Sequence, residues 1–222
     1  ARLRPAIRAD LRTYLAAWFA PPALTVLGVA VFFLVFPGRF DPQLRALREA
    51  LAAAGVPTPP GTVVLVQVLA ALTVGTAINT VFAFGEEFGW RASLLQKLSP
   101  LGRRRATLLV GVIWGVWHWP IIAMGYNYGF DYPGAPWVGM AAMVWFTVVV
   151  GVLLAWVAYR ADSVWPAAVG HGAINAIGAV GLLFVTGQTS SLVGPAITGA
   201  LTLVPWVVAG AYLLRRAPVF EG

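Results

Sequence analysis

The chain contains no cysteine, and only 10% of its 222 residues are charged. The absence of cysteine excludes disulfides and thiolate catalysis. Soluble domains are about one quarter charged, so the shortage of charge, together with a hydrophobic content of 59%, excludes an ordinary soluble protein. No polar stretch is long enough to fold separately. We therefore predict a single integral-membrane domain over residues 1–222, folded as an all-α polytopic helix bundle.

Six hydrophobic segments are long enough to cross a bilayer, whose core requires roughly 20 residues of helix. The predicted transmembrane helices are residues 13–36, 66–97, 105–124, 137–159, 164–185 and 193–214. The second exceeds the required length, so we expect it to tilt, to kink near Gly85–Gly89 or to project beyond the membrane. The first follows several arginines but is too long for the core of a signal peptide, so we predict that it is an uncleaved span.

A short amphipathic segment separates the first two predicted spans. Asp41-Pro42 is typical of a helix start, and Gly55 is typical of a helix end. Between them, leucines repeat at helical spacing opposite charged side chains. This pattern predicts a short helix that lies on the membrane interface.

The net charge of +7 has two interpretations, binding to nucleic acid or orientation in a membrane. Lys and Arg accumulate in cytoplasmic loops. With a cytoplasmic N-terminus, the six spans place eleven basic residues inside: Arg2, Arg4, Arg8, Arg12, Lys97, Arg103, Arg104, Arg105, Arg160, Arg215 and Arg216. Only three fall outside: Arg39, Arg45 and Arg48. The split predicts that both termini are cytoplasmic. It also explains the charge without nucleic acid, so membrane lipid is the expected partner.

Titratable side chains inside these segments are few, and they are costly in hydrocarbon unless they pair with one another or serve a reaction. Glu86, Glu87 and Arg91 lie in the second segment, and the two histidines, His118 and His171, lie in the third and fifth. Glu87 precedes Arg91 by four residues, which is the favoured order for an intrahelical ion pair. Glu86 lies about 100° further around the helix, so we expect it to face away from that pair and to be able to accept a proton.

Several tryptophans accompany these groups in the sequence. Trp114 and Trp117 precede His118 in the third segment, and Trp90 follows the two glutamates in the second. Indole rings of this kind can pack around a pocket, although most tryptophans of a membrane protein belong to its core or to its interfacial belts. We predict that these three line a pocket near His118.

His171 and Asn175 share one face of the fifth segment, beside Gly172, which lets another helix or a substrate backbone approach closely. The rise of a helix places Glu86, His118, His171 and Asn175 at a similar depth in the cytoplasmic half of the membrane. Each polar side chain, taken singly, would equally suit a hydrogen bond between helices. Their common depth predicts that they form one functional site.

Three motifs carry a resemblance to a known family. Glu86-Glu87-x-x-x-Arg91, an aromatic residue four before His118, and His171-x-x-x-Asn175 follow in this order on successive hydrophobic segments. They resemble the CAAX prenyl protease and bacteriocin-processing (CPBP) intramembrane proteases, which include the type II CAAX proteases and many bacterial Abi proteins. The resemblance covers about residues 65–185. The family usually has Phe where this chain has Trp114, a change that we expect to alter pocket shape more than chemistry.

The resemblance implies an intramembrane endopeptidase with a membrane cavity open to the cytosol. Its substrate would be a membrane-associated peptide or a lipidated protein, prenylated in the namesake substrates of the family. Glu86 would activate the attacking water with help from His118. His171 and Asn175 would polarise the scissile carbonyl or stabilise the oxyanion. As a second layer, Glu87 and Arg91 would hold Glu86 in place.

The role of a metal stays open. The family is commonly described as metalloproteases, and Glu86, His118 and His171 are the candidate ligands for Zn²⁺. The chain has no His-Glu-x-x-His helix, and a water activated by glutamate without a metal would use the same residues.

Two other classes of function use the same residues. A proton-coupled transporter or channel would employ Glu86, His118 and His171 as a relay. The chain shows little internal repeat and no paired broken helices of the transporter kind, which disfavours this alternative. A catalytically silent scaffold of the same fold is the third class. The high alanine, glycine and arginine content, with a single lysine, is typical of a GC-rich genome and predicts a prokaryotic cell membrane.

Overall fold

The computed structural model describes residues 3–4 and 10–221, so Arg2 and Arg8, counted above among the inner basic residues, lie outside the described residues. The described chain is helical and contains no strand, which confirms the all-α prediction. The helices are α1 (Leu11–Val35), α2 (Arg45–Ala53), α3 (Pro60–Ala70), α4 (Thr76–Glu87), α5 (Leu95–Leu98), α6 (Arg103–Trp117), α7 (Trp119–Ile122), α8 (Trp137–Ala161), α9 (Trp165–Ile177) and α10 (Val204–Arg216). Short 3-10 or π segments are η1 (Pro37–Arg39), η2 (Ala71–Gly75), η3 (Phe88–Leu94), η4 (Ser99–Leu101), η5 (Val180–Phe184) and η6 (Pro218–Phe220).

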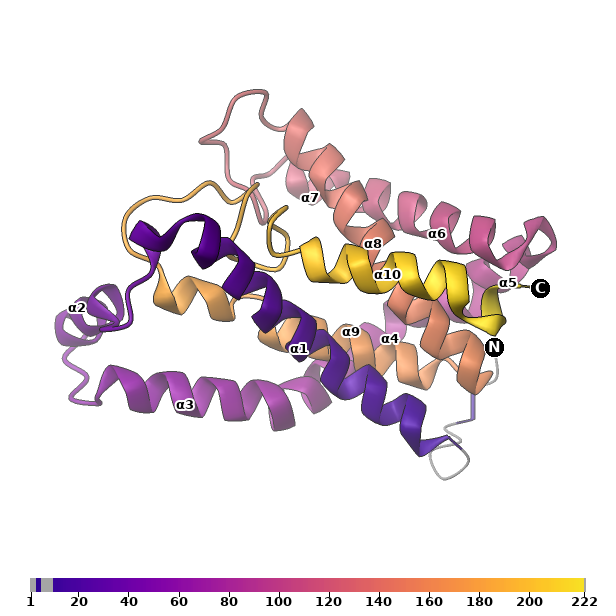
Figure 1. The fold of residues 1–222 in the computed structure, drawn as a ribbon, viewed down its shortest axis with the longest axis horizontal. Helices are drawn as coiled ribbons and strands as arrows, with labels where there is room; N and C mark the ends of the chain where they lie inside the picture. The colour runs from indigo at the N-terminus through magenta and orange to yellow at the C-terminus, as the bar shows by residue number, and fades with distance from the viewer. Residues whose placement is uncertain (1–2, 5–9, 222) are drawn as a thin grey trace.

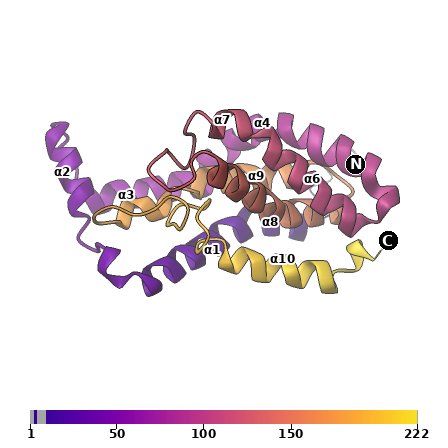
Figure 2. The same ribbon diagram turned by 90° about the horizontal axis from the view of Figure 1, so that it is seen from above.

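The helices form an elongated bundle around α8 and α9 (Figure 1). Seen from above, α8 and α9 lie between α1 and α10 on one side and α4 and α6 on the other (Figure 2). The packing agrees with this arrangement, because α9 contacts both α1 and α4 while α8 contacts both α6 and α10. The middle layer therefore holds much of the buried core.

Four helical segments of the described chain are long and apolar enough to cross a membrane: Leu11–Val35, Pro60–Leu101, Trp137–Ala161 and Trp165–Phe184. They correspond to the first, second, fourth and fifth predicted spans. The third predicted span is shorter than expected, because α6 ends at Trp117 and Pro120 lies in the first turn of the separate helix α7. A helical bundle of membrane-spanning type is thus confirmed.

The last predicted span was wrong in its boundary. Residues 193–203 form turns, and the helix begins only at Val204. Gly194 has a φ of 146°, and Pro195 has no backbone N–H to donate to a helix. Hydrophobicity alone extended the prediction across this segment, although its backbone does not support a helix.

The long second hydrophobic segment is one helix of 42 residues, Pro60–Leu101. At 1.5 Å per residue it measures about 63 Å, roughly twice the thickness of a bilayer core. Two π-helical segments, η2 and η3, interrupt it, and η3 begins at Phe88, within the predicted kink region. Such segments bend helices and often occur at functional sites.

The predicted short helix after the first span forms, but it starts later than predicted. The first residue of α2 is Arg45 rather than Pro42. The carboxylate of Asp41 accepts hydrogen bonds from the backbone N of Gln43 at 3.2 Å and of Arg45 at 2.7 Å. Leu44, between them, adopts a left-handed conformation with a φ of 54°, so the helix cannot begin before it.

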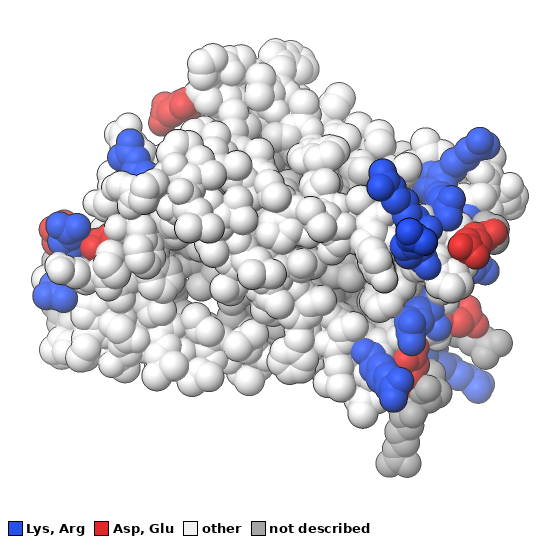
Figure 3. Space-filling model, viewed as in Figure 1, with Lys and Arg blue, Asp and Glu red and all other residues white. Residues whose placement is uncertain are grey.

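Charged side chains gather at the two ends of the molecule and leave most of the visible face uncharged (Figure 3). Several helix ends meet at one end of the molecule (Figure 1). They are the start of α1, the end of α5, the start of α6 and the ends of α8 and α10. We call this the basic end, because these helix ends carry Arg12, Lys97, Arg103, Arg104, Arg105, Arg160, Arg215 and Arg216. The segment with η1 and α2, which contains Arg39, Arg45 and Arg48, lies at the opposite end (Figure 1). The basic residues that were predicted on one side of the membrane therefore lie at one end of the molecule, and those predicted on the other side lie at the opposite end.

The contact between α4 and α9 depends on a glycine. A Cβ added at Gly172 would lie 2.6 Å from both the backbone N and the Oγ1 of Thr80. The helices can therefore approach this closely only if Gly172 has no side chain. The sequence-based expectation of a close helix contact beside His171 is confirmed.

Gly172→Ala is expected to lower the free energy of unfolding by about 1–3 kcal/mol, because the added methyl group forces α4 and α9 apart. Thermal unfolding in detergent micelles measures the effect. Gly61→Ala is the matched control, since a Cβ at that helical position meets nothing within 4 Å. If both variants unfold like the parent, the close approach of the two helices is not needed for stability.

Candidate active site

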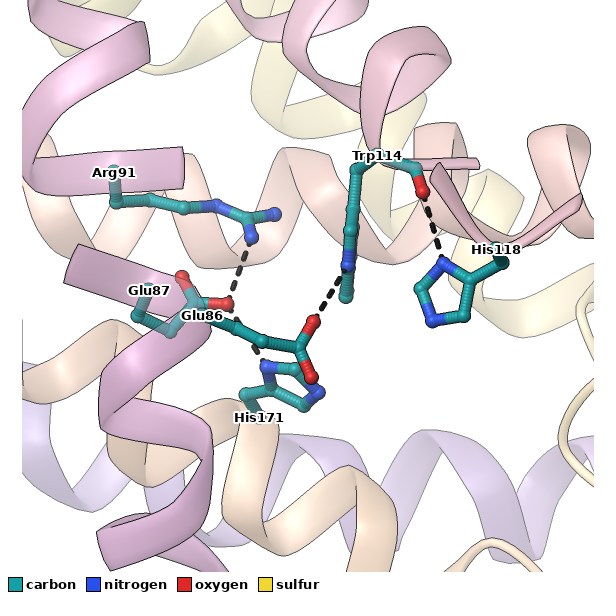
Figure 4. Close-up of polar contacts among 6 residues, drawn as sticks. All are labelled: Glu86, Glu87, Arg91, Trp114, His118 and His171. Atoms are coloured by element: carbon teal, nitrogen blue, oxygen red, sulfur yellow. Dashed lines mark hydrogen bonds and ion pairs between the residues drawn. The ribbon is translucent and has the colours of Figure 1, made fainter. Parts of the chain in front are cut away.

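A buried ion pair stands at the centre of the site. Nη1 of Arg91 donates to Oε1 of Glu87 at 2.8 Å, and the two side chains are 1% and 0% exposed (Figure 4). The predicted intrahelical contact is therefore present. The helix continues from α4 into η3 between the two residues, and the four-residue spacing still brings them together.

The same carboxylate oxygen also contacts α9. Nδ1 of His171 lies 2.9 Å from Oε1 of Glu87 (Figure 4). A carboxylate accepts hydrogen bonds, so Nδ1 carries the proton and Nε2 of His171 is left for other partners. Glu87 was expected to support Glu86, but in the structure it joins Arg91 and His171. The second oxygen, Oε2, is buried without a hydrogen-bond partner among the described atoms.

Glu86 faces away from the ion pair, as its helical position predicted. Its Oε2 accepts a hydrogen bond of 2.9 Å from Nε1 of Trp114 (Figure 4). The glutamate is half-buried, whereas Trp114 is 2% exposed. A phenylalanine, which the family usually has here, could not donate this bond. The change to tryptophan thus adds a polar contact as well as a different shape.

Trp114 is the common neighbour of the polar residues. The guanidinium of Arg91 lies 4.6 Å from the centroid of its ring, in cation–π geometry. The ring of His171 meets it edge-on at 5.2 Å, and the ring of His118 lies 5.8 Å away. Glu86 completes the set through its hydrogen bond. One indole therefore fixes the relative positions of groups from three helical segments.

His118 is positioned by the end of α6. Its Nδ1 lies 2.9 Å from the backbone O of Trp114, a carbonyl in the last turn of that helix (Figure 4). Carbonyls at a helix end lack partners within the helix, and a carbonyl accepts only, so Nδ1 of His118 is the donor. The Nε2 of His118 is left for chemistry. The ring of Trp117 packs perpendicular to the imidazole at 5.0 Å.

A cavity of about 580 Å³ adjoins these residues. Of the predicted site residues, it is lined by Trp114, His118, His171 and Asn175. Trp90 and Trp117 do not line it; they pack edge-on against each other at 5.9 Å, and Trp117 is 54% exposed. Among the three tryptophans expected around a pocket, only Trp114 has that position.

The cavity contains polar residues that the sequence interpretation missed. They are Asn79, Tyr126, Asn127 and Thr198. Asn79 precedes Glu86 by seven residues, about two helical turns, so the helical period could have placed it on the same face. The other three lie outside helices, where no periodic pattern indicates which way a side chain points.

The expected zinc ligands do not form a ligand set in this arrangement. In the part of the chain that the structure describes, no three His, Asp or Glu side chains are close enough to share an ion. Oε2 of Glu86 already accepts the hydrogen bond from Nε1 of Trp114. In this arrangement the residues do not fit a common zinc ion.

Comparison with known proteins identifies a family that the chain resembles. The family model described as type II CAAX prenyl endopeptidase Rce1-like matches residues 63–177. The matched region includes Glu86, His118, His171 and Asn175 and agrees with the 65–185 region expected from the motifs. No curated protein and no solved structure matches the chain.

Proposed function

Because the chain belongs to the type II CAAX prenyl endopeptidase Rce1-like family, we propose that it hydrolyses a peptide bond at the cavity beside Trp114. The family and the long apolar helices make it an integral membrane protein. The single observation that carries the proposed chemistry is the position of Glu86. It accepts a hydrogen bond from the indole of Trp114, and Trp114 lines the cavity together with His118 and His171, although Glu86 itself is not a lining residue.

The first step is the activation of water by Glu86. Its carboxylate takes one proton from a water molecule, and Nε2 of His118 orients that water through a hydrogen bond. The water oxygen bonds to the carbonyl carbon, and the carbonyl electron pair moves onto oxygen. The amide of Asn175 donates to this oxyanion, and His171 adds a second donor from Nε2 in its imidazolium form, in which Nδ1 stays bonded to Glu87. One such donor contributes roughly 10²–10³ in rate.

The second step breaks the carbon–nitrogen bond. As the oxyanion reforms a carbonyl, the bonding pair leaves with the amine nitrogen, and Glu86 returns to it the proton taken from water. The products are a carboxylic acid and an amine. The side chain of Glu86 is again a carboxylate and can start another cycle. Glu87 and Arg91 take no part in proton transfer and hold His171 in its orientation instead.

The proposed substrate is a membrane-associated peptide or a lipidated protein, with membrane lipid as the surrounding partner. We further propose that the basic end faces the cytoplasm of a prokaryotic cell membrane, because Lys and Arg accumulate on that side. The termini would then both be cytoplasmic.

Purified protein in liposomes is expected to cleave a lipid-anchored reporter peptide at the same rate before and after treatment with a zinc chelator. The reason is that Glu86, His118 and His171 form no common ligand set. Mass spectrometry of the products measures the rate and the cleavage site. Chelator saturated beforehand with zinc is the control for non-specific inhibition. Loss of activity that added zinc restores would make the metal-free mechanism wrong.

A proton relay is the competing function for the same residues. In the structure Glu86 contacts Trp114, and an indole N–H donates only and cannot pass a proton onward. The contacts around Glu86 therefore give a relay no support. A silent scaffold differs from the proposed enzyme in one measurable respect, since it would leave every reporter peptide intact.

A further inference from the structure

Asn79 lines the cavity beside Trp114 but takes no part in the two steps above. Its Nδ2 donates a hydrogen bond of 2.8 Å to the backbone O of Gly75. A carbonyl oxygen only accepts, so this bond fixes the orientation of the amide and turns Oδ1 away from Gly75. Oδ1 has no hydrogen-bond partner in the part of the chain that the structure describes, and packed atoms do not enclose it. Asn79 therefore offers a fixed acceptor to an occupant of the cavity.

The contact between α4 and α9 places Asn79 level with the proposed site. A Cβ added at Gly172 of α9 would lie 2.6 Å from the backbone N of Thr80 of α4. Asn79 comes one residue before Thr80, and Asn175 comes three residues after Gly172. Both asparagines line the same cavity. Two amides from neighbouring helices thus meet one occupant.

An acceptor without a donor is costly in this position. The helix Pro60–Leu101, which carries Asn79, is apolar enough to cross a membrane, and lipid chains have no N–H or O–H to donate. Water can supply the donor while the cavity is empty of substrate. When the substrate displaces that water, the substrate itself has to supply the donor. Every residue of a polypeptide except proline carries a backbone N–H, so the backbone is its regular source of donors.

We propose that Oδ1 of Asn79 accepts a hydrogen bond from one backbone N–H of the substrate. This contact, which rests on the proposed function, adds a substrate-binding residue to those named above. In the proposed mechanism Asn175 donates to the scissile carbonyl oxygen, whereas Asn79 accepts from an N–H. An extended peptide presents both kinds of group along its backbone. The two amides together therefore hold the peptide in an extended conformation.

The spacing along α4 indicates which substrate residue makes the contact. Asn79 and Glu86 are seven residues apart in the helix Thr76–Glu87, so they share a face. At 1.5 Å per residue they are about 10 Å apart along the axis. An extended peptide advances about 3.3 Å per residue, so about three residues span that distance. The N–H that Asn79 binds belongs to a residue about three positions from the scissile bond, and proline is excluded there because it has no N–H.

Methylation of single backbone nitrogens in the substrate tests the contact. In a series of lipid-anchored reporter peptides, each backbone N–H on either side of the scissile bond is replaced in turn by N–CH3. Every peptide is assayed in liposomes with the parent protein and with Asn79→Leu, which keeps the size of the side chain and loses its oxygen. Gln67→Leu is the matched control, because it removes an amide from the same long helix outside this cavity.

We expect methylation about three residues from the scissile bond to lower kcat/KM of the parent by about tenfold, the effect of one lost hydrogen bond. Asn79→Leu should show a similar loss with the unmethylated peptide, through KM rather than kcat, because the contact is remote from the reacting bond. The same methyl group should cost Asn79→Leu nothing further, so the two changes are not additive. Gln67→Leu should respond to methylation as the parent does.

Two results would overturn the contact. One is a parent protein that tolerates methylation at every position away from the scissile bond, a result that needs no variant. The other is a loss of equal size in the parent and in Asn79→Leu, which a purely structural role of Asn79 would produce. Thermal unfolding of the variant shows whether Asn79→Leu is folded.

The same comparison by binding separates this contact from the proposed hydrolysis. Glu86→Gln, with and without Asn79→Leu, is titrated with the reporter peptide and with its methylated counterpart, and fluorescence anisotropy gives Kd. Non-additive changes in Kd, together with a parent that cleaves no reporter, would contradict the proposed function and leave the contact of Asn79 intact. Cleavage by the parent with additive changes in Kd would do the reverse. A reporter that binds to none of the proteins would contradict both.

Discussion

Glu86→Gln is expected to lower the rate of peptide cleavage by about 10²–10⁴, the usual contribution of a general base. The substitution keeps the shape of the side chain and an oxygen that can accept the hydrogen bond from Nε1 of Trp114. It removes the ability to take a proton from water. The folded structure is therefore expected to survive while the reaction stops, and Glu86→Ala should abolish cleavage in the same way. Product formation per enzyme, measured with the lipid-anchored reporter, gives the rate.

Glu49→Gln is the matched control for this prediction. Glu49 is an exposed glutamate on α2, distant in sequence from the site, and the change removes one carboxylate in the same manner. Its cleavage rate should equal that of the parent. A Glu86→Gln variant that cleaves at the parental rate would show that another group activates the water, and the proposed mechanism would be wrong. Unfolding temperatures of both variants separate loss of chemistry from loss of structure.

Helical spacing predicted the part of the site that lies within one helix. The contact of Glu87 with Arg91 and the divergence of Glu86 follow from positions around a single axis, and both are present. The contact of Glu87 with His171 was not foreseen, because it requires α4 and α9 to dock at the level set by Gly172. Local pattern indicates a face of a helix, but not which neighbour that face meets.

The shape of the cavity could not be predicted from the sequence for a similar reason. Depth along the helices correctly placed His118 and His171 beside one cavity. Part of the lining, however, comes from residues such as Tyr126 and Asn127, which lie in a non-helical segment without periodicity. The break of α6 at His118 and the turns of residues 193–203 shape the same region, and hydropathy predicted continuous helices there. Irregular backbone near membrane depth is tolerated only where it is buried in protein or lines a cavity.

Glu87→Leu is expected to lower the free energy of unfolding by about 3–5 kcal/mol, because it removes the carboxylate that hydrogen-bonds the buried guanidinium of Arg91. Arg91 is 1% exposed, so water cannot replace the lost carboxylate. The stacking of Arg91 on Trp114 remains, but a ring face compensates only part of a full charge. Unfolding in mixed micelles with increasing denaturing detergent measures the change.

The double variant Glu87→Leu/Arg91→Leu separates stability from catalysis. Replacing both partners of a buried ion pair by apolar residues is often neutral or stabilising, so the double variant should regain most of the stability that Glu87→Leu loses. Cleavage should not return with it. His171 would still lack the carboxylate oxygen that Nδ1 contacts at 2.9 Å, and its Nε2 would no longer be held toward the cavity. If the double variant cleaves at the parental rate, the contact between Glu87 and His171 is dispensable, and the ion pair serves stability alone.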